Sequence, residues 1–338
     1  MSRPITIIGA GAIVRHAHLP AYRDAGWTVA GIYDRNLETA QALASEFGIE
    51  KVFESLEEAA AGGGIFDIAT PAKAFPDVLA VLPQGATVLL QKPFGETWAD
   101  ACALHRQIRE RGLNALLNFQ LRHAPSVVEA RRLIAAGEAG EILDIEVNVN
   151  VHMPWEQWPF LIGVPGMEIV YHSIHYIDLV RALMGEPEGV WCRSMPHPSA
   201  PEITTCRTTA IFSRGQIRAV INTYHAHTYG PRHQRSTVKI EGTRAALVLQ
   251  MGLNIDYPHG AEDWLEISTP DWRRVPLAGN WIPYAFRGPM AEAQTWADDP
   301  AATPQTEIND ALKTMRLAEA CMRSSQSGGL SPDSILSL

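Results

Sequence analysis

Hydrophobic and polar positions follow two different rhythms along the chain, and the change falls near residue 120. Before it, short aliphatic runs alternate with stretches whose apolar positions recur at helical spacing. Strands are expected at 5–8, 27–33, near Val52, 65–69, 87–90 and 115–119, and helices at 12–25, 37–47, after Ser55, 73–82 and 96–111. Alternating strands and helices predict a doubly wound parallel sheet that binds its ligand at the carboxyl ends of the strands.

After residue 120, long strand-like segments dominate. Strands are expected at roughly 142–152, 188–196, 203–213, 216–226, 235–241, 245–251 and 263–268, and helices at 123–136, 168–184 and 307–325. This pattern predicts an α+β domain with a large, open, mostly antiparallel sheet. We therefore expect an α/β protein with domains at 1–120 and 121–325, a final helix free to pack back on the first domain, and a flexible tail at 326–338.

Composition narrows the class of protein. The 338 residues suffice for roughly two domains, and the 46% hydrophobic content is that of a globular protein. A net charge of −9 without a basic block argues against nucleic acid as a partner. No apolar run approaches the roughly 20 residues that span a bilayer, so we expect no membrane segment. The four scattered cysteines, Cys102, Cys192, Cys206 and Cys321, predict reduced thiols in a cytoplasmic protein.

The junction between the first strand and the first helix carries the most informative motif. Residues 8–14 read Ile-Gly-Ala-Gly-Ala-Ile-Val. Gly9 permits a tight turn, Gly11 allows a ligand to approach the main chain, and the free N–H groups of the next helix favour a pyrophosphate. The alternative is a tight turn without a ligand. The third motif position is Val14, where glycine or alanine is usual.

The end of the second strand bears on the choice of dinucleotide. Asp34 lies about 20 residues beyond the turn, where an acid accepts the ribose hydroxyls of NAD. Arg35 follows it and offers a cation to a 2′-phosphate, so NAD is favoured and NADP stays open.

Two further motifs end predicted strands. Thr70-Pro71 closes the fourth predicted strand, either as a simple terminator or as exposed backbone at the cofactor edge. Gln91-Lys92-Pro93 closes the fifth, where a lysine points into the crevice that a nicotinamide would occupy. Near that cationic ring the pKa of the amine should fall, which suits Lys92 to proton transfer; a plain surface lysine is the alternative.

The helix at 168–184 carries a polar stripe on an apolar background. Tyr171, His175 and Asp178 share one face at i, i+4 and i+7, with His172 roughly 60° away. The stripe predicts a partly buried site, and a buried hydrogen-bond network is the plain alternative. A zinc site at His172 and His175, with His225 and His227 as further ligands, is a weaker alternative, because no third ligand has an obvious spacing. We therefore expect no metal.

An aromatic loop follows the first long strand of the second domain. Trp155, Trp158 and Phe160 either form a wall that stacks on a sugar or make a packing cluster. This loop and residues 227–234 are where we expect substrate specificity to be determined.

Taken together, these motifs resemble the Gfo/Idh/MocA oxidoreductases from about residue 3 to 330. The resemblance rests on the glycine turn followed by His18-Leu19-Pro20-Ala21, Thr70-Pro71, Gln91-Lys92-Pro93, Asn118, Arg122, His175-Tyr-Ile-Asp178, Glu241-Gly242-Thr243 and residues 312–324. It implies a Rossmann domain and a catalytic pair, Lys92 and His175. The residues expected to contact the dinucleotide are Gly9, Ala10, Gly11, Ala12, Ile13, Asp34, Arg35, Thr70, Pro71, Gln91, Lys92 and Asn118.

The chain also departs from the family pattern. Gln91 replaces the usual glutamate, and Phe75 stands where a histidine is common. Many members carry an aspartate four residues before the catalytic histidine, where this chain has Tyr171, and Ser173 replaces a common glycine. Tyr171 or His172 would have to take the part of the missing acid.

The resemblance implies an NAD(P)-dependent dehydrogenase or reductase for a sugar, polyol or related cyclic hydroxy compound. Lys92 would hydrogen-bond the reacting hydroxyl, His175 would take its proton, and Asp178 would orient His175 or bind a neighbouring hydroxyl. A dinucleotide- or sugar-sensing regulator, a zinc hydrolase and dinucleotide-assisted glycosidic cleavage stay open as alternatives. An uncovered face of the second sheet predicts a homodimer or homotetramer.

Overall fold

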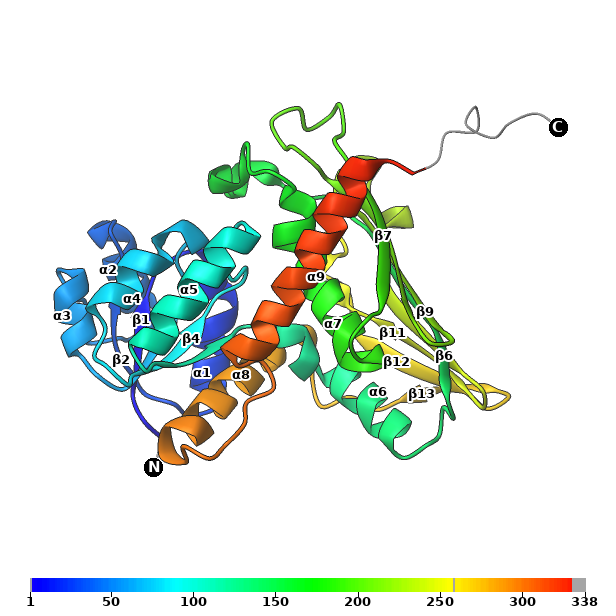
Figure 1. Ribbon diagram of the computed structural model, residues 1–338. Coiled ribbons are helices and arrows are strands. Elements are labelled where there is room, and N and C mark those ends of the chain that lie inside the picture. The colour runs from blue at the N-terminus through cyan, green and yellow to red at the C-terminus, as the bar shows by residue number, and fades with distance from the viewer. Residues whose placement is uncertain (1, 258, 330–338) are drawn as a thin grey trace.

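The computed structural model describes residues 2–257 and 259–329, and the first part of the chain folds around a parallel sheet (Figure 1). Its strands are β1 (Ile5–Ile8), β2 (Val29–Tyr33), β3 (Ile65–Ile68), β4 (Thr87–Leu90) and β5 (Asn114–Leu117). They lie in the order β2-β1-β3-β4-β5, all parallel, which confirms the predicted doubly wound sheet. Val52, expected in a strand, forms only a single bridge with Ile32.

Helices connect these strands on both faces of the sheet (Figure 1). They are η1 (Val14–His18), α1 (Leu19–Asp24), α2 (Leu37–Phe47), α3 (Leu56–Ala61), η2 (Ala72–Ala74), α4 (Phe75–Val81) and α5 (Trp98–Glu110). The predicted cap at Ser55 is confirmed, because its side chain accepts the Glu58 N–H. Thr97 and Asp100 form a capping box that begins α5.

The second sheet is larger and mostly antiparallel, as predicted. Its strands are β6 (Ile142–Asn150), β7 (Gly189–Met195), β8 (Arg207–Arg214), β9 (Ile217–Tyr224), β10 (Arg235–Gly242), β11 (Ala246–Gln250), β12 (Trp264–Ser268) and β13 (Trp272–Val275). They lie in the order β13-β12-β11-β10-β6-β9-β8-β7, and only β6 and β9 pair in parallel. Along β6, Ile145, Val147 and Val149 are buried and their neighbours are partly exposed, so one face of the sheet packs on the core.

Helical segments cover the inner face of this sheet and join it to the first. They are η3 (Gln120–His123), α6 (Pro125–Ala135), η4 (Trp155–Gln157), η5 (Pro159–Leu161), η6 (Glu168–Ser173), α7 (Ile174–Met184), η7 (Pro231–His233), η8 (Gly252–Asn254), α8 (Trp281–Asp298) and α9 (Ile308–Ser327). None of the helices in residues 2–257 and 259–329 has the length and apolar character needed to cross a membrane. The four cysteines are free thiols.

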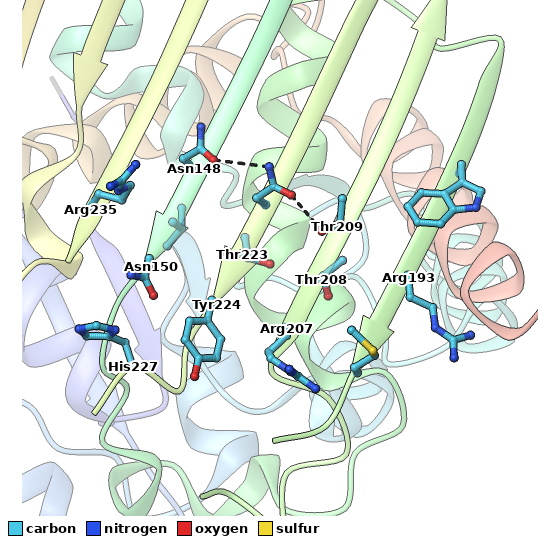
Figure 2. A pocket seen from close by; sticks show the side chains of 14 residues that line it. Asn148, Asn150, Arg193, Arg207, Thr208, Thr209, Thr223, Tyr224, His227 and Arg235 are labelled. Carbon is cyan, nitrogen blue, oxygen red and sulfur yellow. Dashed lines mark hydrogen bonds between the residues drawn. The ribbon is translucent and has the colours of Figure 1, made fainter. Parts of the chain in front are cut away.

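The outer face of the second sheet is hollowed and carries both polar and apolar side chains (Figure 2). A cavity of about 630 Å³ lies over its strands, with polar side chains such as Asn148 and Asn222 in its wall. Exposed apolar side chains flank it, and Trp191 on β7 lies directly opposite Ile211 on β8. This face therefore carries an apolar stripe that no described residue covers.

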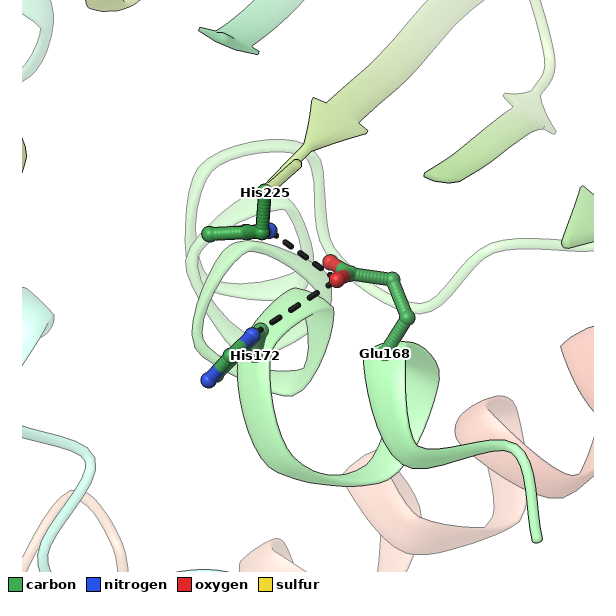
Figure 3. A group of neighbouring side chains, drawn as sticks. All are labelled: Glu168, His172 and His225. Carbon is green, nitrogen blue, oxygen red and sulfur yellow. Dashed lines mark hydrogen bonds and ion pairs between the residues drawn. The ribbon is translucent and has the colours of Figure 1, made fainter. Parts of the chain in front are cut away.

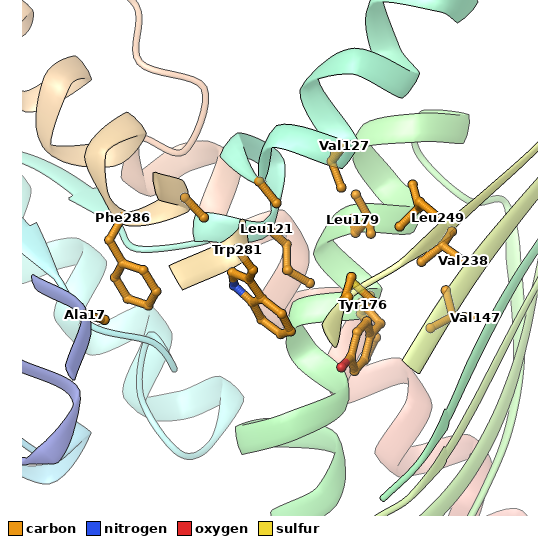
Figure 4. Close-up of a cluster of buried hydrophobic side chains, with 14 of the residues drawn as sticks. Ala17, Leu121, Val127, Val147, Tyr176, Leu179, Val238, Leu249, Trp281 and Phe286 are labelled. Carbon is orange, nitrogen blue, oxygen red and sulfur yellow. The ribbon is translucent and has the colours of Figure 1, made fainter. Parts of the chain in front are cut away.

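Helix α8 was missed by the sequence pattern, because Pro283 and Pro289 interrupt the segment that forms it. The helix returns to the first sheet. Phe286 lies 5.2 Å from the His18 ring, and Trp281 lies among core side chains of the second domain (Figure 4). The hydrophobic core is thus continuous between the two sheets.

Helix α9 also spans both parts of the molecule (Figure 1). Its first turns bury Ile308 and Met315 against the side chains that pack on the first sheet. Near its end, Ser324 accepts the Cys192 N–H of β7 at 2.8 Å. The helix continues to Ser327 rather than ending at 325, so the first residues of the expected tail are helical, and residues 330–338 lie outside the described residues.

Candidate active site

The glycine turn after β1 has the geometry that a phosphate-binding loop needs. Gly9 has φ +111°, and a Cβ added there would lie 2.7 Å from the Ala69 carbonyl oxygen. Its N–H donates to the Tyr33 carbonyl at 2.7 Å. A Cβ on Gly11, in contrast, would meet no described atom within 4 Å. The protein backbone requires glycine at Gly9, whereas the missing side chain at Gly11 leaves open space for a ligand.

Asp34 ties this turn to the end of β2. One carboxylate oxygen accepts the Ala10 N–H at 2.8 Å, and the other accepts the Asn36 N–H at 2.8 Å. Arg35 is exposed, and Ala12 and Ile13 begin the helical segment beyond the turn. The residues predicted to bind the pyrophosphate and the ribose therefore lie together at the carboxyl edge of the parallel sheet.

A buried polar network lies beneath that edge, and sequence analysis did not identify it as part of the site. His18 Nδ1 is 2.6 Å from Asp67, whose same oxygen also accepts the Tyr22 hydroxyl at 2.7 Å. The other ring nitrogen of His18 faces the amides of Gln91 at 3.2 Å and Asn118 at 3.4 Å. The only available signal was His18 within the opening family motif. This network fixes the side chains of Gln91 and Asn118.

Two buried oxygens at this edge suit a dinucleotide. The Thr70 hydroxyl follows β3, the side-chain amide oxygen of Asn118 follows β5, and neither has a hydrogen-bond partner among the described residues. Buried polar atoms are normally paired, so both are suited to a polar ligand. With the open space over Gly11 and the carboxylate of Asp34, the residues present fit NAD.

The two glycines should respond differently to the same substitution. Gly11→Ala is expected to leave the unfolding midpoint unchanged and to weaken NAD binding roughly 10-fold or more, because its methyl group enters the ligand space. Gly9→Ala is expected to lower the midpoint as well, because its methyl group collides with backbone. Thermal unfolding and fluorescence titration with NADH measure both effects. Unchanged NADH affinity in Gly11→Ala would contradict this placement of the cofactor.

Lys92 follows β4 and reaches across to the second domain. Its Nζ donates to the Tyr171 carbonyl at 2.6 Å and lies 5.9 Å from the centre of the Tyr171 ring. Burial lowers the pKa of this amine to about 8, and the Glu168 carboxylate opposes that shift only in part. The sequence-based expectation of a lysine with a depressed pKa at this position agrees with the structure, although burial rather than the nicotinamide produces the shift.

The helix expected at 168–184 is present, but its first turn is a π-helix, η6, that continues into α7. Tyr171 donates its hydroxyl to Glu96 at 2.7 Å, and burial raises the pKa of that hydroxyl. Burial also lowers the pKa of His175 well below its usual value, and Lys92 adds to the effect. His175 Nδ1 has no hydrogen-bond partner among the described residues. The structure thus brings Lys92 to the helix that carries His175.

Asp178 makes contacts different from those expected of it. It is fully buried, and Arg122 donates to both of its oxygens at 2.7 and 2.6 Å. Thr314 on α9 donates a third hydrogen bond at 2.8 Å. Burial raises the pKa of the carboxyl group, with Arg122 opposing. Its described partners do not include His175. Asp178 therefore links α7 to η3 through Arg122 and to α9 through Thr314, and it does not orient the imidazole.

Glu168 is the residue that sequence analysis missed. Its carboxylate lies 2.9 Å from His225 Nδ1 and 3.5 Å from His172 Nδ1 (Figure 3). Burial would raise the pKa of Glu168, but the two histidines outweigh it and lower the pKa; burial and His225 lower the pKa of His172 to about 4. A glutamate seven residues before His175 had no recognised spacing, so only the fold reveals this cluster.

The aromatic loop lies against the same cluster. The Trp155 ring stacks on the His172 ring at 5.5 Å, and the Phe160 ring lies 5.9 Å from that of Tyr171. These side chains pack around the residues of η6, so the loop forms one wall of the site.

Comparison with known proteins agrees with this architecture. Residues 4–119 match the model of an oxidoreductase family with an NAD-binding Rossmann fold, and residues 127–248 match the Gfo/Idh/MocA C-terminal domain. The chain belongs to the Gfo/Idh/MocA family. The resemblance drawn from the motifs is confirmed, and the protein is an NAD(P)-dependent dehydrogenase or reductase.

Individual Gfo/Idh/MocA relatives are distant but cover most of the chain. D-apiose dehydrogenase from Paraburkholderia graminis is 25% identical, over 95% of this chain and 87% of that protein. An oxidoreductase from Agrobacterium radiobacter, crystallised with NAD+, L-tartaric acid and magnesium, has a TM-score of 0.80 at 21% identity, covering 97% and 98% of the two chains. Aldose-aldose oxidoreductase from Caulobacter crescentus, complexed with glycerol, has a TM-score of 0.82 at 16% identity, covering 97% and 99%.

Proposed function

We propose that this protein transfers a hydride between a nicotinamide cofactor and the CH–OH group of a sugar, polyol or related cyclic hydroxy compound, with Lys92 and His175 handling the proton. The contact of the Lys92 amine with the helix that carries His175 supports this most strongly, because it joins the cofactor edge to the second domain. The names of relatives such as D-apiose dehydrogenase support the substrate class.

The pKa directions favour Lys92 as the group that exchanges the proton. A catalytic acid or base works best with a pKa near the working pH, and the amine has a pKa of about 8. His175, with its pKa far below the usual value, is neutral at that pH. We therefore propose that the amine takes the hydroxyl proton and that the neutral imidazole hydrogen-bonds the same oxygen. This exchanges the roles that the resemblance implies. Bound NAD would accept the hydride.

Asp34 favours NAD over NADP. Its carboxylate is held at the end of β2 by two backbone N–H groups, where it would repel a 2′-phosphate. Arg35 is exposed beside it, so NADP is the weaker alternative.

A panel of aldoses, polyols and cyclic hydroxy acids, each with NAD and with NADP, tests the proposed function. The absorbance of reduced nicotinamide reports turnover. We expect at least one sugar or polyol to be oxidised, with a higher kcat/KM for NAD than for NADP. Absence of turnover with either dinucleotide across the panel would contradict the proposal.

We also propose that the protein is a cytoplasmic homodimer or homotetramer that associates through the outer face of the eight-stranded sheet. The free thiols fit a reducing compartment. Trp191 and Ile211 form an exposed apolar pair on neighbouring strands, 43% and 39% exposed. An exposed apolar patch of this kind is typical of an interface between copies.

A charged side chain in the apolar stripe of Trp191 and Ile211 should prevent the subunits from associating. Ile211→Arg is expected to give a monomer at micromolar concentration, where the unmodified protein is a dimer or tetramer. Val128→Arg is the matched control, because Val128 is an exposed apolar residue, 50% exposed, on α6. Light scattering after size exclusion measures the mass. A monomeric unmodified protein would refute the proposed assembly.

A further inference from the structure

We propose that Glu168, His172 and His225 bind a divalent transition-metal ion in the candidate active site. One carboxylate and two imidazoles form a ligand set used by zinc enzymes and by non-haem iron sites. The three residues come from the π-turn η6 and from the segment after β9, so the fold rather than local sequence brings them together. This ligand set shares His172 and His225 with the zinc alternative considered from the sequence, but Glu168 takes the place of His175. It departs from the expectation of no metal.

The spacing of the ligand atoms fits an ion. Ligand atoms about 2.1 Å from a metal lie about 3.0 Å apart at a right angle and about 3.4 Å apart at the tetrahedral angle. The Glu168 carboxylate is 2.9 Å from His225 Nδ1 and 3.5 Å from His172 Nδ1. One donor atom from each residue lies within 4.8 Å of the other two. Little side-chain movement is needed to close on an ion.

A plain hydrogen-bond network explains only part of this arrangement. His225 Nδ1 is within hydrogen-bond distance of the carboxylate, but His172 Nδ1 has no hydrogen-bond partner among the described residues. His172 is only 9% exposed, and this buried atom lies 3.5 Å from the Glu168 carboxylate, within ion-pair distance but without a hydrogen bond. Leaving a buried polar atom unpaired costs about 1–3 kcal/mol, and a metal ion would remove that cost.

Neighbouring side chains hold the three ligands in place. Ser173 donates its hydroxyl to the second oxygen of Glu168 at 3.0 Å, and the Thr223 hydroxyl lies 2.8 Å from that of Ser173. The π-turn places residues five apart on one face, which brings Ser173 over Glu168. Trp155 stacks on the His172 ring. Support of this kind around the ligands is typical of metal sites, and it gives a reason for serine where the family commonly has glycine.

The position of the ligand set points to a role in substrate binding. The charges of Glu168 and Lys92 influence each other's surroundings: Glu168 raises the pKa of Lys92, and Lys92 lowers the pKa of His172. Three protein ligands leave coordination positions open for two adjacent oxygens of a sugar, polyol or hydroxy acid. This role in substrate binding rests on the proposed function, whereas the binding of the ion itself does not.

Zinc binding tests the site without any substrate. Chelator-treated protein, dialysed against Zn²⁺, is expected to bind one equivalent per chain, measured by mass spectrometry of the metal. Glu168→Gln and His225→Ala are expected to abolish saturable binding, and Ser173→Ala to weaken it about 10- to 100-fold. His227→Ala is the matched control, because His227 is another buried histidine on the same segment and its ring donates to the Gly230 carbonyl. Cobalt substitution adds visible absorption bands that Glu168→Gln should lose.

The outcomes separate this inference from the proposed function. Circular dichroism and NADH affinity show whether each variant keeps its fold. Zinc binding lost in Glu168→Gln and retained in His227→Ala, with the fold intact, supports the site. Absence of stoichiometric zinc in the unmodified protein, or equal binding by folded Glu168→Gln, overturns it. Sugar turnover by protein that binds no zinc would overturn the metal site alone, and zinc binding without turnover on any panel compound would count only against the proposed function.

Discussion

Lys92→Arg is expected to lower kcat by about 10²- to 10⁴-fold while NADH binding stays within a few-fold of the unmodified protein. Arginine retains the positive charge but does not release a proton at any working pH, so the substitution removes proton transfer specifically. Lys92→Met, which removes the charge as well, should lose at least as much. Lys313→Arg is the matched control, because that lysine is half exposed and its ion pair with Glu186 lies at the surface.

The pH profile gives the same prediction a second readout. In the oxidation direction the amine must start unprotonated, and its pKa is about 8. The rate of oxidation should therefore rise as pH increases through about 8, and the rate of reduction should fall over the same range. Lys92→Arg should lose this inflection. An unchanged pH profile in that variant would mean that another group exchanges the proton with the substrate, and His175 would be the first candidate.

Asp178→Ala is expected to destabilise the folded protein by about 3–5 kcal/mol, the cost of breaking a buried ion pair. Asp178 is fully buried, and the substitution removes both hydrogen bonds from Arg122 and the one from Thr314. Asp310 also pairs with Arg122, at 2.7 Å, so part of the positive charge of Arg122 stays neutralised in this variant. The shift of the unfolding midpoint in urea measures the effect.

A surface pair provides the comparison for Asp178. Arg218 lies 2.6 Å from Asp144, but its side chain is 58% exposed, so Arg218→Ala should leave the unfolding midpoint in urea almost unchanged. A loss of turnover in Asp178→Ala without a change of midpoint would return Asp178 to the catalytic role implied by the resemblance. A lowered midpoint identifies it as a positioning residue that fastens α7.

The class of each sheet, parallel or mostly antiparallel, was predictable because it depends on short-range patterns. The strand, glycine turn and helix around Gly9 and Gly11 are local, and each needs only a few residues to be recognised. The prolines that follow Thr70 and Lys92 mark the ends of two strands, and this local signal placed both residues at the carboxyl edge of the sheet. Alternation along residues 142–150 likewise identified β6 before its partners were known.

What the sequence did not predict depends on contacts between distant segments. Helix α8 was hidden because Pro283 and Pro289 break the pattern, although packing on the first domain stabilises it. The ion pair of Asp178 joins residues 56 positions apart, and Glu168 meets a histidine 57 positions later. Helical spacing alone grouped Tyr171 with His175, because it does not register the π-turn in which Tyr171 lies. It grouped Asp178 with His175 because it does not reveal a partner from another element.

A crystal structure with NAD+ and the best substrate of the panel would show whether Lys92 and His175 meet at the reacting carbon. We expect the reacting hydroxyl oxygen within roughly 2.6–3.2 Å of both Lys92 Nζ and a His175 ring nitrogen, with the nicotinamide ring against the adjacent carbon. A sugar bound elsewhere, for example on the outer face of the second sheet, or a nicotinamide ring on the far side of Lys92 from His175, would contradict it.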